Sequence, residues 1–288
     1  MKLSNPNFFG RIKLGDITAF SIDPSTCTYC SGYSSDLCFK LIRFGLMAEA
    51  NLDGNGHVGG EKRVKHYSNF HRILLVGEGD FSFAACLARR FGSAVNMVAT
   101  SLDSRATLRR SYTTPAIDNW ETIEGLGGTV LHEVDAHTMS EHPILKHKSF
   151  DRIVYNFPHA GFCGPEPSFS QIKLHKDLVR GFLKNAKTML TDDGEIHVTH
   201  KTAHPYSKWE IEKLAEEQGL FLVEEVQFSV WDYEGYVNRR GSGSKCNGTF
   251  PIGEASTYKF SKNDHGMLCA NALLNLSSAD LVECARAK

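Results

Sequence analysis

A turn rich in glycine and acidic residues follows the first strongly apolar run of the chain. Residues 73–76 (ILLV) predict a buried strand, and an apolar helical pattern begins near residue 81. In doubly wound α/β proteins, this order of strand, glycine turn and helix presents backbone N–H groups to a nucleotide-like ligand. The two glycines would let the chain turn sharply and let a ligand approach the backbone. We therefore predict a cofactor site formed by Gly77, Glu78, Gly79, Asp80, Phe81 and Ser82.

The turn differs from a dinucleotide-binding turn in two ways. Ser82 stands where a G-x-G-x-x-G motif has its third glycine, and Asp80 would place a negative charge beside a pyrophosphate. Both features argue against NAD. S-adenosylmethionine has a cationic sulfonium, an ammonium group and no phosphate, and the carboxylate of Glu78 or Asp80 would attract these charges. We expect S-adenosyl-L-methionine as the cofactor.

Polar residues also follow the next predicted strands, and parallel strands place such residues at one edge of the sheet. Asp103 could accept hydrogen bonds from ribose hydroxyls, and Asp135 could accept one from an adenine amino group. Each also has a structural explanation, because Asp103 could cap a helix and Asp135 could form a turn. Together with Asn156 after the fourth strand, they favour a shared cofactor crevice.

The tetrapeptide Asn156-Phe157-Pro158-His159 resembles the [Asn/Asp]-x-Pro-[aromatic] motif of methyltransferases that act on planar nitrogens. The resemblance implies that the Asn156 oxygen accepts a hydrogen bond from the target N–H. Pro158 would stiffen the turn, and His159 would serve as a general base or as a stacking surface. We predict Asn156, Pro158 and His159 as catalytic residues. The alternative is a proline turn in which Asn156 bonds its own backbone.

Basic and aromatic residues gather in a Gly/Ser-rich loop around residues 236–245, which we call the late loop. Such side chains on one loop suit phosphate contact and base stacking, although a solvated surface loop is the alternative. We predict that the loop contacts substrate RNA through Tyr236, Arg239, Arg240 and Lys245.

From residue 70 onward, strand and helix patterns alternate, which predicts βαβ units and a mainly parallel sheet. Strands are expected at 72–76, 95–101, 129–134, 150–156 and 194–200, and helices near 81–91, 104–111, 116–125, 140–147, 168–190 and 207–218, the last capped by Ser207.

No helical pattern separates the last two strand signals, at 220–231 and 258–260, so these strands should be antiparallel. Five parallel strands and a terminal antiparallel hairpin define a seven-stranded sheet typical of the Rossmann-like methyltransferase fold. We assign residues 69–262 to this domain, 1–68 to an irregular or flexible extension and 263–288 to a C-terminal tail.

Composition is that of an ordinary globular protein. The 288 residues are 41% hydrophobic and carry a net charge of −1, so RNA contact would need a local basic patch. No apolar run is long enough for a membrane helix, and the scattered cysteines favour reduced thiols inside the cell. We predict no metal, because the three thiols at 27, 30 and 38 lack a fourth ligand and the histidines at 197, 200 and 204 fit no ligand spacing.

Several of these motifs, in order, resemble the eukaryotic 25S/large-subunit rRNA (uridine-N3) methyltransferase family, which has many plant members. The motifs are ILLVGEGDFSFA, FDRIVYNFPHAGF, GEIHVTHK and G-Y-x-x-R-R-G at 235–241, and the resemblance covers about residues 70–261. It implies methyl transfer from S-adenosylmethionine to N3 of a uridine. It also implies large-subunit rRNA or a pre-ribosomal particle as partner, and the nucleolus, with the cytoplasm as the alternative location.

Two other functions stay open at this point. A catalytically silent methyltransferase-like module could bind RNA or protein during ribosome assembly, although Asp103 and the N-F-P-H motif argue against it. An NAD-dependent oxidoreductase is disfavoured by Asp80 and by the terminal hairpin.

Overall fold

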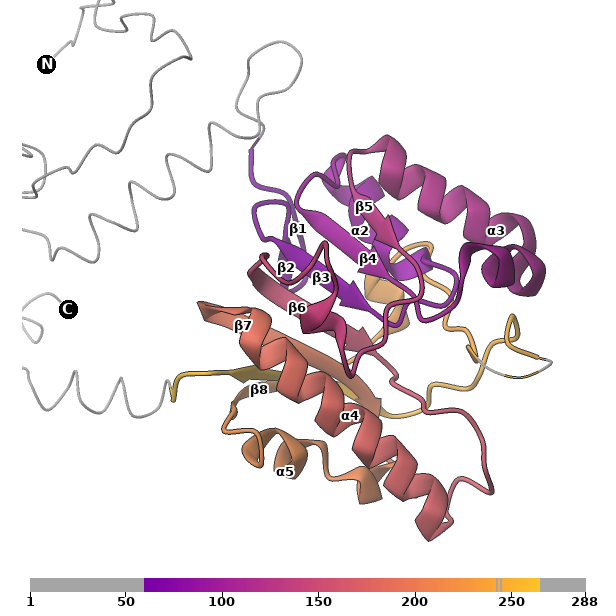
Figure 1. Ribbon diagram of the computed structural model, residues 1–288, viewed down its shortest axis with the longest axis vertical. Helices are drawn as coiled ribbons and strands as arrows, with labels where there is room; N and C mark the ends of the chain where they lie inside the picture. Colours follow the sequence, from indigo (N-terminus) through magenta and orange to yellow (C-terminus); the bar gives the residue numbers. More distant parts are fainter. Residues whose placement is uncertain (1–59, 242, 244, 265–288) are drawn as a thin grey trace, which may run out of the picture. The chain divides into compact units, whose positions relative to one another are not determined.

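The computed structural model of the chain describes residues 60–241, 243 and 245–264 (Figure 1). Cys27, Cys30 and Cys38 therefore lie outside the described residues, as do most of the predicted N-terminal extension and nearly all of the predicted tail. Among the described residues, no helix is both long and apolar enough to cross a membrane.

A seven-stranded sheet forms the centre of the described unit. Five strands run parallel to one another: β3 (Ile73–Val76), β4 (Met97–Thr100), β5 (Thr129–Leu131), β6 (Phe150–Asn156) and β7 (Leu190–Lys201). The order is β5-β4-β3-β6-β7-β9-β8, in which β9 (Ala255–Ser261) pairs antiparallel with both β7 and β8 (Phe221–Gln227). The predicted fold class, with its terminal antiparallel pair, is confirmed.

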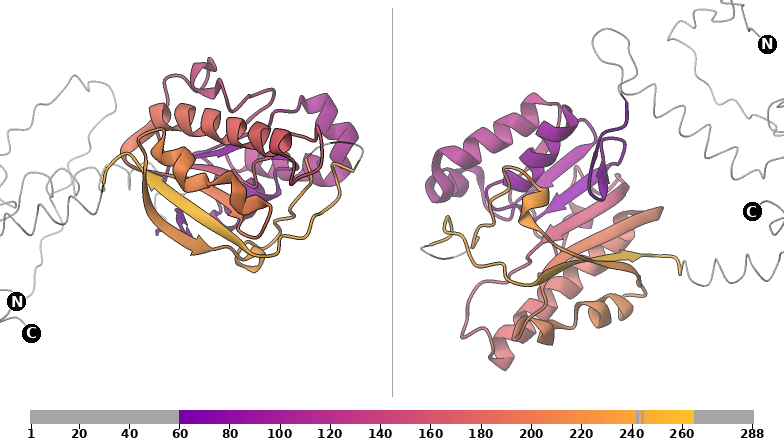
Figure 2. Two further views of the ribbon diagram at one scale, coloured as in Figure 1. Left: turned by 90° about the horizontal axis from the view of Figure 1, so that it is seen from below. Right: turned by 180° about the vertical axis from the view of Figure 1, so that it is seen from behind.

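Helices cover both faces of this sheet (Figures 1 and 2). Side chains alternate between the faces of a strand, so Ile73 and Leu75 pack in one apolar cluster and Leu74 and Val76 in another. The first cluster includes α2 (Ser82–Phe91) and α3 (Arg105–Gly125), and the second includes α4 (Phe169–Met189) and α5 (Ile211–Glu216). Burial on both faces explains why β3 is apolar throughout.

Three of the predicted helices differ from those observed. The helices expected at 104–111 and 116–125 are a single helix, α3, which Ser104 caps by accepting a hydrogen bond from the Thr107 N–H at 3.2 Å. The helix expected at 140–147 is only a short 3₁₀ turn, η2 (Met139–Glu141). Pro143 holds the residue before it in an extended conformation, which ends the helical geometry at His142.

The segment around Ser207 also differs from the prediction. Ser207 does not cap a helix, because it lies inside the 3₁₀ helix η3 (Tyr206–Trp209), and α5 starts only at Ile211. The strand expected at 220–231 ends at Gln227, and a further 3₁₀ turn, η4 (Val230–Asp232), follows it. A long loop then leads from η4 back to β9.

Residues 61–68, which end the predicted extension, form two short strands in the described part. β1 (Arg63–Val64) and β2 (Tyr67–Ser68) pair antiparallel. Tyr67 is fully buried in the α2–α3 cluster, and its hydroxyl lies 3.2 Å from Nδ1 of His197 on β7.

Candidate active site

A cavity of about 160 Å³ lies at the carboxyl ends of β3, β4 and β6, which is where ligands bind in open α/β sheets. We call it the first cavity. Most of the site residues predicted from the sequence line it: Gly77, Glu78, Gly79, Asp80, Ser82, Asp103, Asn156, His159, Tyr236, Arg239 and Arg240. Residues from strand ends far apart in sequence are therefore brought together as expected.

Four predicted site residues do not line the first cavity. Phe81 is buried beneath the turn, and Asp135 is exposed and accepts a hydrogen bond from the His137 N–H at 2.8 Å. Pro158 lines a neighbouring cavity, and Lys245 is exposed on the late loop. The roles assigned to these four stay predictions.

Gly77 is required by packing beneath the turn. Its φ of +67° is in the left-handed region that favours glycine, and a Cβ at this position would collide with the ring of Tyr155. The sharp turn is therefore as expected, but the space beside Gly77 holds an aromatic ring of β6. Gly79 is less crowded, since a Cβ there would lie 3.3 Å from the Tyr112 hydroxyl.

The N-terminus of α2 is already occupied by carboxylates of the turn itself. Glu78 Oε2 accepts a hydrogen bond from the Ala84 N–H at 3.3 Å, and Asp80 Oδ1 accepts one from the Ser82 N–H at 3.0 Å. A free helix N-terminus attracts anions, but these two side chains use its donors, and the charge of Asp80 opposes another negative charge. The arrangement disfavours a phosphate-bearing ligand and suits a cationic one.

Burial raises the pKa of Glu78 to about 8, and the charge of Asp80 acts in the same direction. Glu78 therefore holds a proton at neutral pH, and a cation bound beside it would favour the ionised form. Burial likewise raises the pKa of Asp103, whose carboxyl group is half-buried at the mouth of the same cavity.

The late loop is fastened to the glycine turn. Arg239 Nε lies 2.6 Å from Asp80 Oδ2, and both side chains are largely buried. The Ser82 hydroxyl donates to the Val237 carbonyl at 3.2 Å and accepts from the Val237 N–H at 3.0 Å. Tyr236 and Arg239, which we predicted to contact RNA, therefore line the cavity beside the turn.

The side-chain amide of Asn156, in the first cavity, lacks, within the residues that the structure describes, the hydrogen bonds that a buried amide usually makes. Asn156 ends β6, where it is in register with Thr199 of β7. Neither its Oδ1 nor its Nδ2 has a hydrogen-bond partner among the described residues, although both atoms are buried. Buried polar atoms are nearly always hydrogen-bonded, so an amide with both ends free at a cavity wall is suited to a ligand. The buried Tyr112 hydroxyl also has no partner in the described part of the chain, and it lines the same cavity.

A second cavity, of about 320 Å³, adjoins the first and shares with it Phe157, His159, Arg239, Arg240 and Phe250. Other lining residues include Lys201 at the end of β7 and Tyr206 and Trp209 of η3. Lys201 could have been found from its position, because it follows the predicted strand 194–200 directly. Phe250 and Glu166 lie in irregular loops, where periodicity offers no signal.

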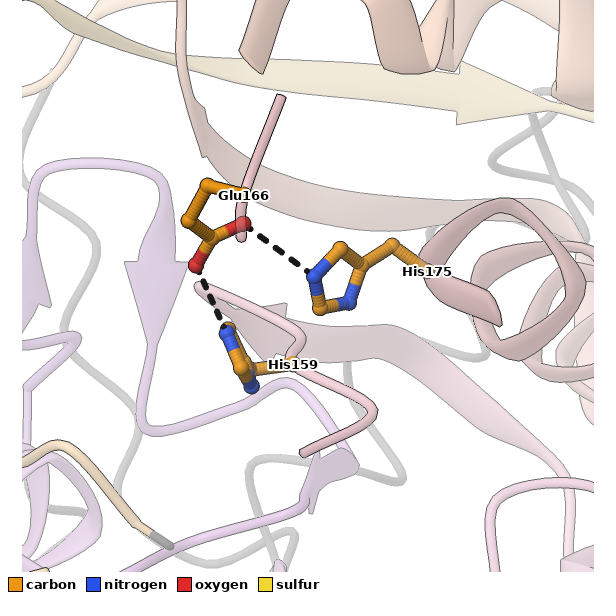
Figure 3. Close-up of side chains that lie close together, drawn as sticks. All are labelled: His159, Glu166 and His175. Carbon is orange, nitrogen blue, oxygen red and sulfur yellow. Dashed lines mark hydrogen bonds and ion pairs between the residues drawn. The ribbon is translucent and has the colours of Figure 1, made fainter. Parts of the chain in front are cut away.

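His159, Glu166 and His175 form a polar cluster (Figure 3), and the first two of these residues line the second cavity. His159 Nε2 lies 3.0 Å from Glu166 Oε1, and His175 Nε2 lies 3.3 Å from Glu166 Oε2. The Gly161 N–H donates to His159 Nδ1 at 3.0 Å. His159 Nδ1 must then carry a lone pair, so the ring proton is on Nε2 and is donated to Glu166.

The cluster has the composition of a metal site but the opposite hydrogen-bond polarity. A histidine that binds a metal through Nε2 usually donates its Nδ1–H to an acceptor. Here Nδ1 of both histidines faces a backbone N–H, from Gly161 and from Ala160. The Gln171 amide nitrogen also lies 2.8 Å from His175 Nε2. Both histidines would have to change tautomer to bind a metal through Nε2, so we interpret the cluster as a hydrogen-bonded support for His159.

The sheet order and the cavity at the strand ends are those of the Rossmann-like methyltransferase fold. The sequence profile of the BMT5-like family, described as rRNA (uridine-N3-)-methyltransferase BTM5-like, matches residues 74–240. The chain belongs to this family of rRNA methyltransferases, which depend on S-adenosylmethionine.

Relatives span plants and yeast. An uncharacterized protein of Arabidopsis thaliana is 52% identical, covering 70% of this chain and 98% of the relative. Heavy metal-associated isoprenylated plant protein 41 of the same species is 47% identical over 74% of this chain, but the match covers only 41% of that protein. The 25S rRNA (uridine(2634)-N(3))-methyltransferase of Saccharomyces cerevisiae is 25% identical, covering 69% of this chain and 75% of the yeast protein.

Proposed function

We propose that the protein transfers a methyl group from S-adenosylmethionine to N3 of a uridine in large-subunit rRNA. The observation that carries the proposal is the buried Asn156 amide, unpartnered at both ends among the described residues, at the carboxyl edge of β6. Membership in the BMT5-like family and the activity named for the yeast relative support this choice of substrate.

The residues of the first cavity suit the proposed cofactor. Asp103 follows β4, where a carboxylate can accept hydrogen bonds from ribose hydroxyls. Asp80 supplies negative charge next to a cationic group, and Glu78 does so once a bound cation displaces its proton. The two side chains also leave the α2 N-terminus without a place for phosphate. S-adenosylmethionine bound there would supply an electrophilic methyl group.

Asn156 is complementary to the imide edge of uracil. Its Oδ1 can accept a hydrogen bond from N3–H while its Nδ2 donates to the neighbouring carbonyl oxygen. Such a pair of bonds holds the imide edge beside the cofactor cavity before N3 loses its proton, and positioning of this kind is a large part of catalysis. His159 serves as a wall for the base, because its Nδ1 accepts the Gly161 N–H and its Nε2 proton is bound to Glu166.

The cellular setting is part of the proposal. The activity named for the yeast relative acts on 25S rRNA, which supports a pre-ribosomal particle as the partner and the nucleus or nucleolus as the location. A protein partner is compatible with the net charge of −1, because the chain as a whole has no strong attraction for RNA.

The test is methyl transfer by the full chain from labelled S-adenosylmethionine to large-subunit rRNA, with mass spectrometry of the digested nucleosides. We expect N3-methyluridine as the labelled product. Label in a different nucleoside would overturn the substrate assignment. Absence of label from both naked rRNA and pre-ribosomal particles, with a thermal shift by the cofactor intact, would favour the catalytically silent binding module instead.

A further inference from the structure

We propose that the second cavity takes the pyrimidine base to be methylated, and that the Lys201 ammonium stabilises the anion of its imide. This inference rests on the proposed function and assigns a binding site and a residue that the function itself does not require.

The second cavity is placed and shaped for a flat base. It adjoins the first cavity through Phe157, His159 and Phe250, so a base in one would meet a methyl donor in the other. Its volume of about 320 Å³ is ample for one base with part of its ribose. Bases removed from a stack are held between aromatic side chains, and these three rings supply such surfaces.

Lys201 is a cation of this cavity that lacks a carboxylate partner in the described part of the chain. It ends β7, two residues beyond Thr199, which is in register with Asn156 on β6. Its Nζ lies 4.7 Å from the centre of the Tyr206 ring and 4.9 Å from that of Phe250, and it forms no ion pair with a described carboxylate. The two ring faces hold the ammonium in place without neutralising it.

The charges around Lys201 come from several elements. Glu166, on the loop before α4, is close enough to oppose the lowering of the Lys201 pKa by burial. His200 and Tyr206 lie beside it, and burial keeps His200 neutral by lowering its pKa to about 4. Arg239 and Arg240 line the same cavity, but Arg239 is paired with Asp80. Lys201 is therefore the amine best placed to meet charge on a bound base.

Methyl transfer to an imide nitrogen creates the need for such a cation. The N3–H bond breaks and the proton leaves to water, while its electron pair stays on the base as an anion shared by N3 and the two carbonyl oxygens. That pair then forms the N–CH₃ bond as the sulfur–carbon bond breaks and its electrons remain on sulfur. An ammonium beside a carbonyl oxygen stabilises the anion in a partly desolvated site.

The kinetic test compares Lys201→Met, Lys201→Arg and the control Lys208→Met, which removes an exposed lysine of η3. We expect Lys201→Met to lower kcat by about 100-fold at neutral pH, and Lys201→Arg to retain most activity because it keeps the charge. The loss in Lys201→Met should shrink as pH rises, since hydroxide then forms the anion. A loss of equal size at every pH, or none, would overturn the proposal.

A binding test works without turnover. Trp209 lines the second cavity, so its fluorescence, measured in a background in which the other two tryptophans are replaced (Trp120→Phe and Trp231→Phe), reports a ligand there. 5-Fluorouridine, whose imide is more acidic than that of uridine, should bind more tightly as its imide ionises, and this gain should vanish in Lys201→Met but not in Lys208→Met. An equal gain in both variants would reject the role of Lys201.

The outcomes separate the two proposals. N3-methyluridine formed equally well by Lys201→Met would leave the proposed function standing and remove this inference. Label in another nucleoside would remove the proposed function, and fluorouridine binding that is independent of Lys201 would then remove the inference as well.

Discussion

The two adjoining cavities differ in how their charges are balanced. In the first, the acids are already engaged, since Glu78 and Asp80 accept backbone hydrogen bonds and Asp80 is paired with Arg239. In the second, aromatic rings predominate and Lys201 has no carboxylate partner among the described residues. Acidic side chains that already bind the helix N–H groups favour a cationic cofactor over a phosphate-bearing one. An ammonium held among aromatic rings, without an ion pair in the described part of the chain, favours a flat base that becomes an anion. The difference supports separate roles for the two cavities, with the cofactor bound in the first and the base in the second.

The largest effect on activity is expected from Asn156→Ala, in the first cavity. We expect methyl transfer to fall by about 100-fold or more, because the base loses both hydrogen bonds that orient it. Cofactor affinity and unfolding free energy should change little, since the Asn156 amide has no partner among the described residues.

Asn185→Ala provides the opposite pattern. Asn185 on α4 accepts a hydrogen bond from the Ser140 hydroxyl and donates to the His137 carbonyl, so its loss should lower stability and spare activity. Full activity in Asn156→Ala, measured by single-turnover methyl transfer, would refute the role of this amide.

The Asp80–Arg239 pair should contribute the next largest effect. Because both side chains are mostly buried, Arg239→Met leaves a carboxylate unpaired and should lower the unfolding free energy by about 3 kcal/mol. Asp80→Asn in the same chain should recover part of that loss. Additive effects in this double-mutant cycle, followed by urea unfolding, would show that the pair does not hold the late loop to the turn.

Asp103→Ala should weaken cofactor binding by about 10- to 30-fold, as expected for the loss of hydrogen bonds to ribose hydroxyls. Asp135→Ala is the matched comparison, because Asp135 is exposed and lies outside the residues that line the first cavity. Calorimetry with S-adenosylhomocysteine measures both. A larger loss in Asp135→Ala than in Asp103→Ala would place the ligand elsewhere than we propose.

The smallest effect should be a pH dependence set by Glu78. Its pKa is raised to about 8 in the folded chain, so a cationic ligand must displace a proton below that pH. Cofactor affinity should therefore rise a few-fold as pH increases toward about 8 and then level off, with proton release visible as a buffer-dependent binding enthalpy. Glu78→Gln should remove both signals.

The same pKa shift has a consequence for stability. The folded chain keeps a proton on Glu78 that the unfolded chain releases once the pH exceeds 4.5, the usual pKa of a glutamate. Stability should thus fall as pH rises from about 4.5 to 8, and Glu78→Gln should flatten that part of the profile. An unchanged profile would show that Glu78 is not the group responsible.

Much of this site could be predicted because parallel strands end at one edge. The glycine turn, Asp103 and Asn156 follow β3, β4 and β6 directly, so sheet topology alone brings them together. Asp135 was expected by the same rule. However, β5 ends at Leu131 rather than at 134, so an irregular segment separates the strand end from Asp135. Asp135 is therefore not among the residues that line the first cavity.

The contacts of the late loop could not be predicted from the sequence. Arg239 is 159 positions from Asp80, and no periodicity links a Gly/Ser-rich loop to a turn so distant in the chain. For the same reason, a loop residue such as Glu166 offers no sign that it will hold His159. Such pairings depend on where the loops return, which local patterns do not specify.

The most direct test of the two-cavity account is a crystal structure of the full chain with S-adenosylhomocysteine and uridine. We predict the ribose of S-adenosylhomocysteine on Asp103, its amino acid end toward Glu78 and Asp80, and the uracil ring in the second cavity beside Lys201, with its imide edge turned toward Asn156 of the first cavity. Binding of the adenosine part of S-adenosylhomocysteine in the second cavity, or of uracil at a position away from Asn156, would contradict the account.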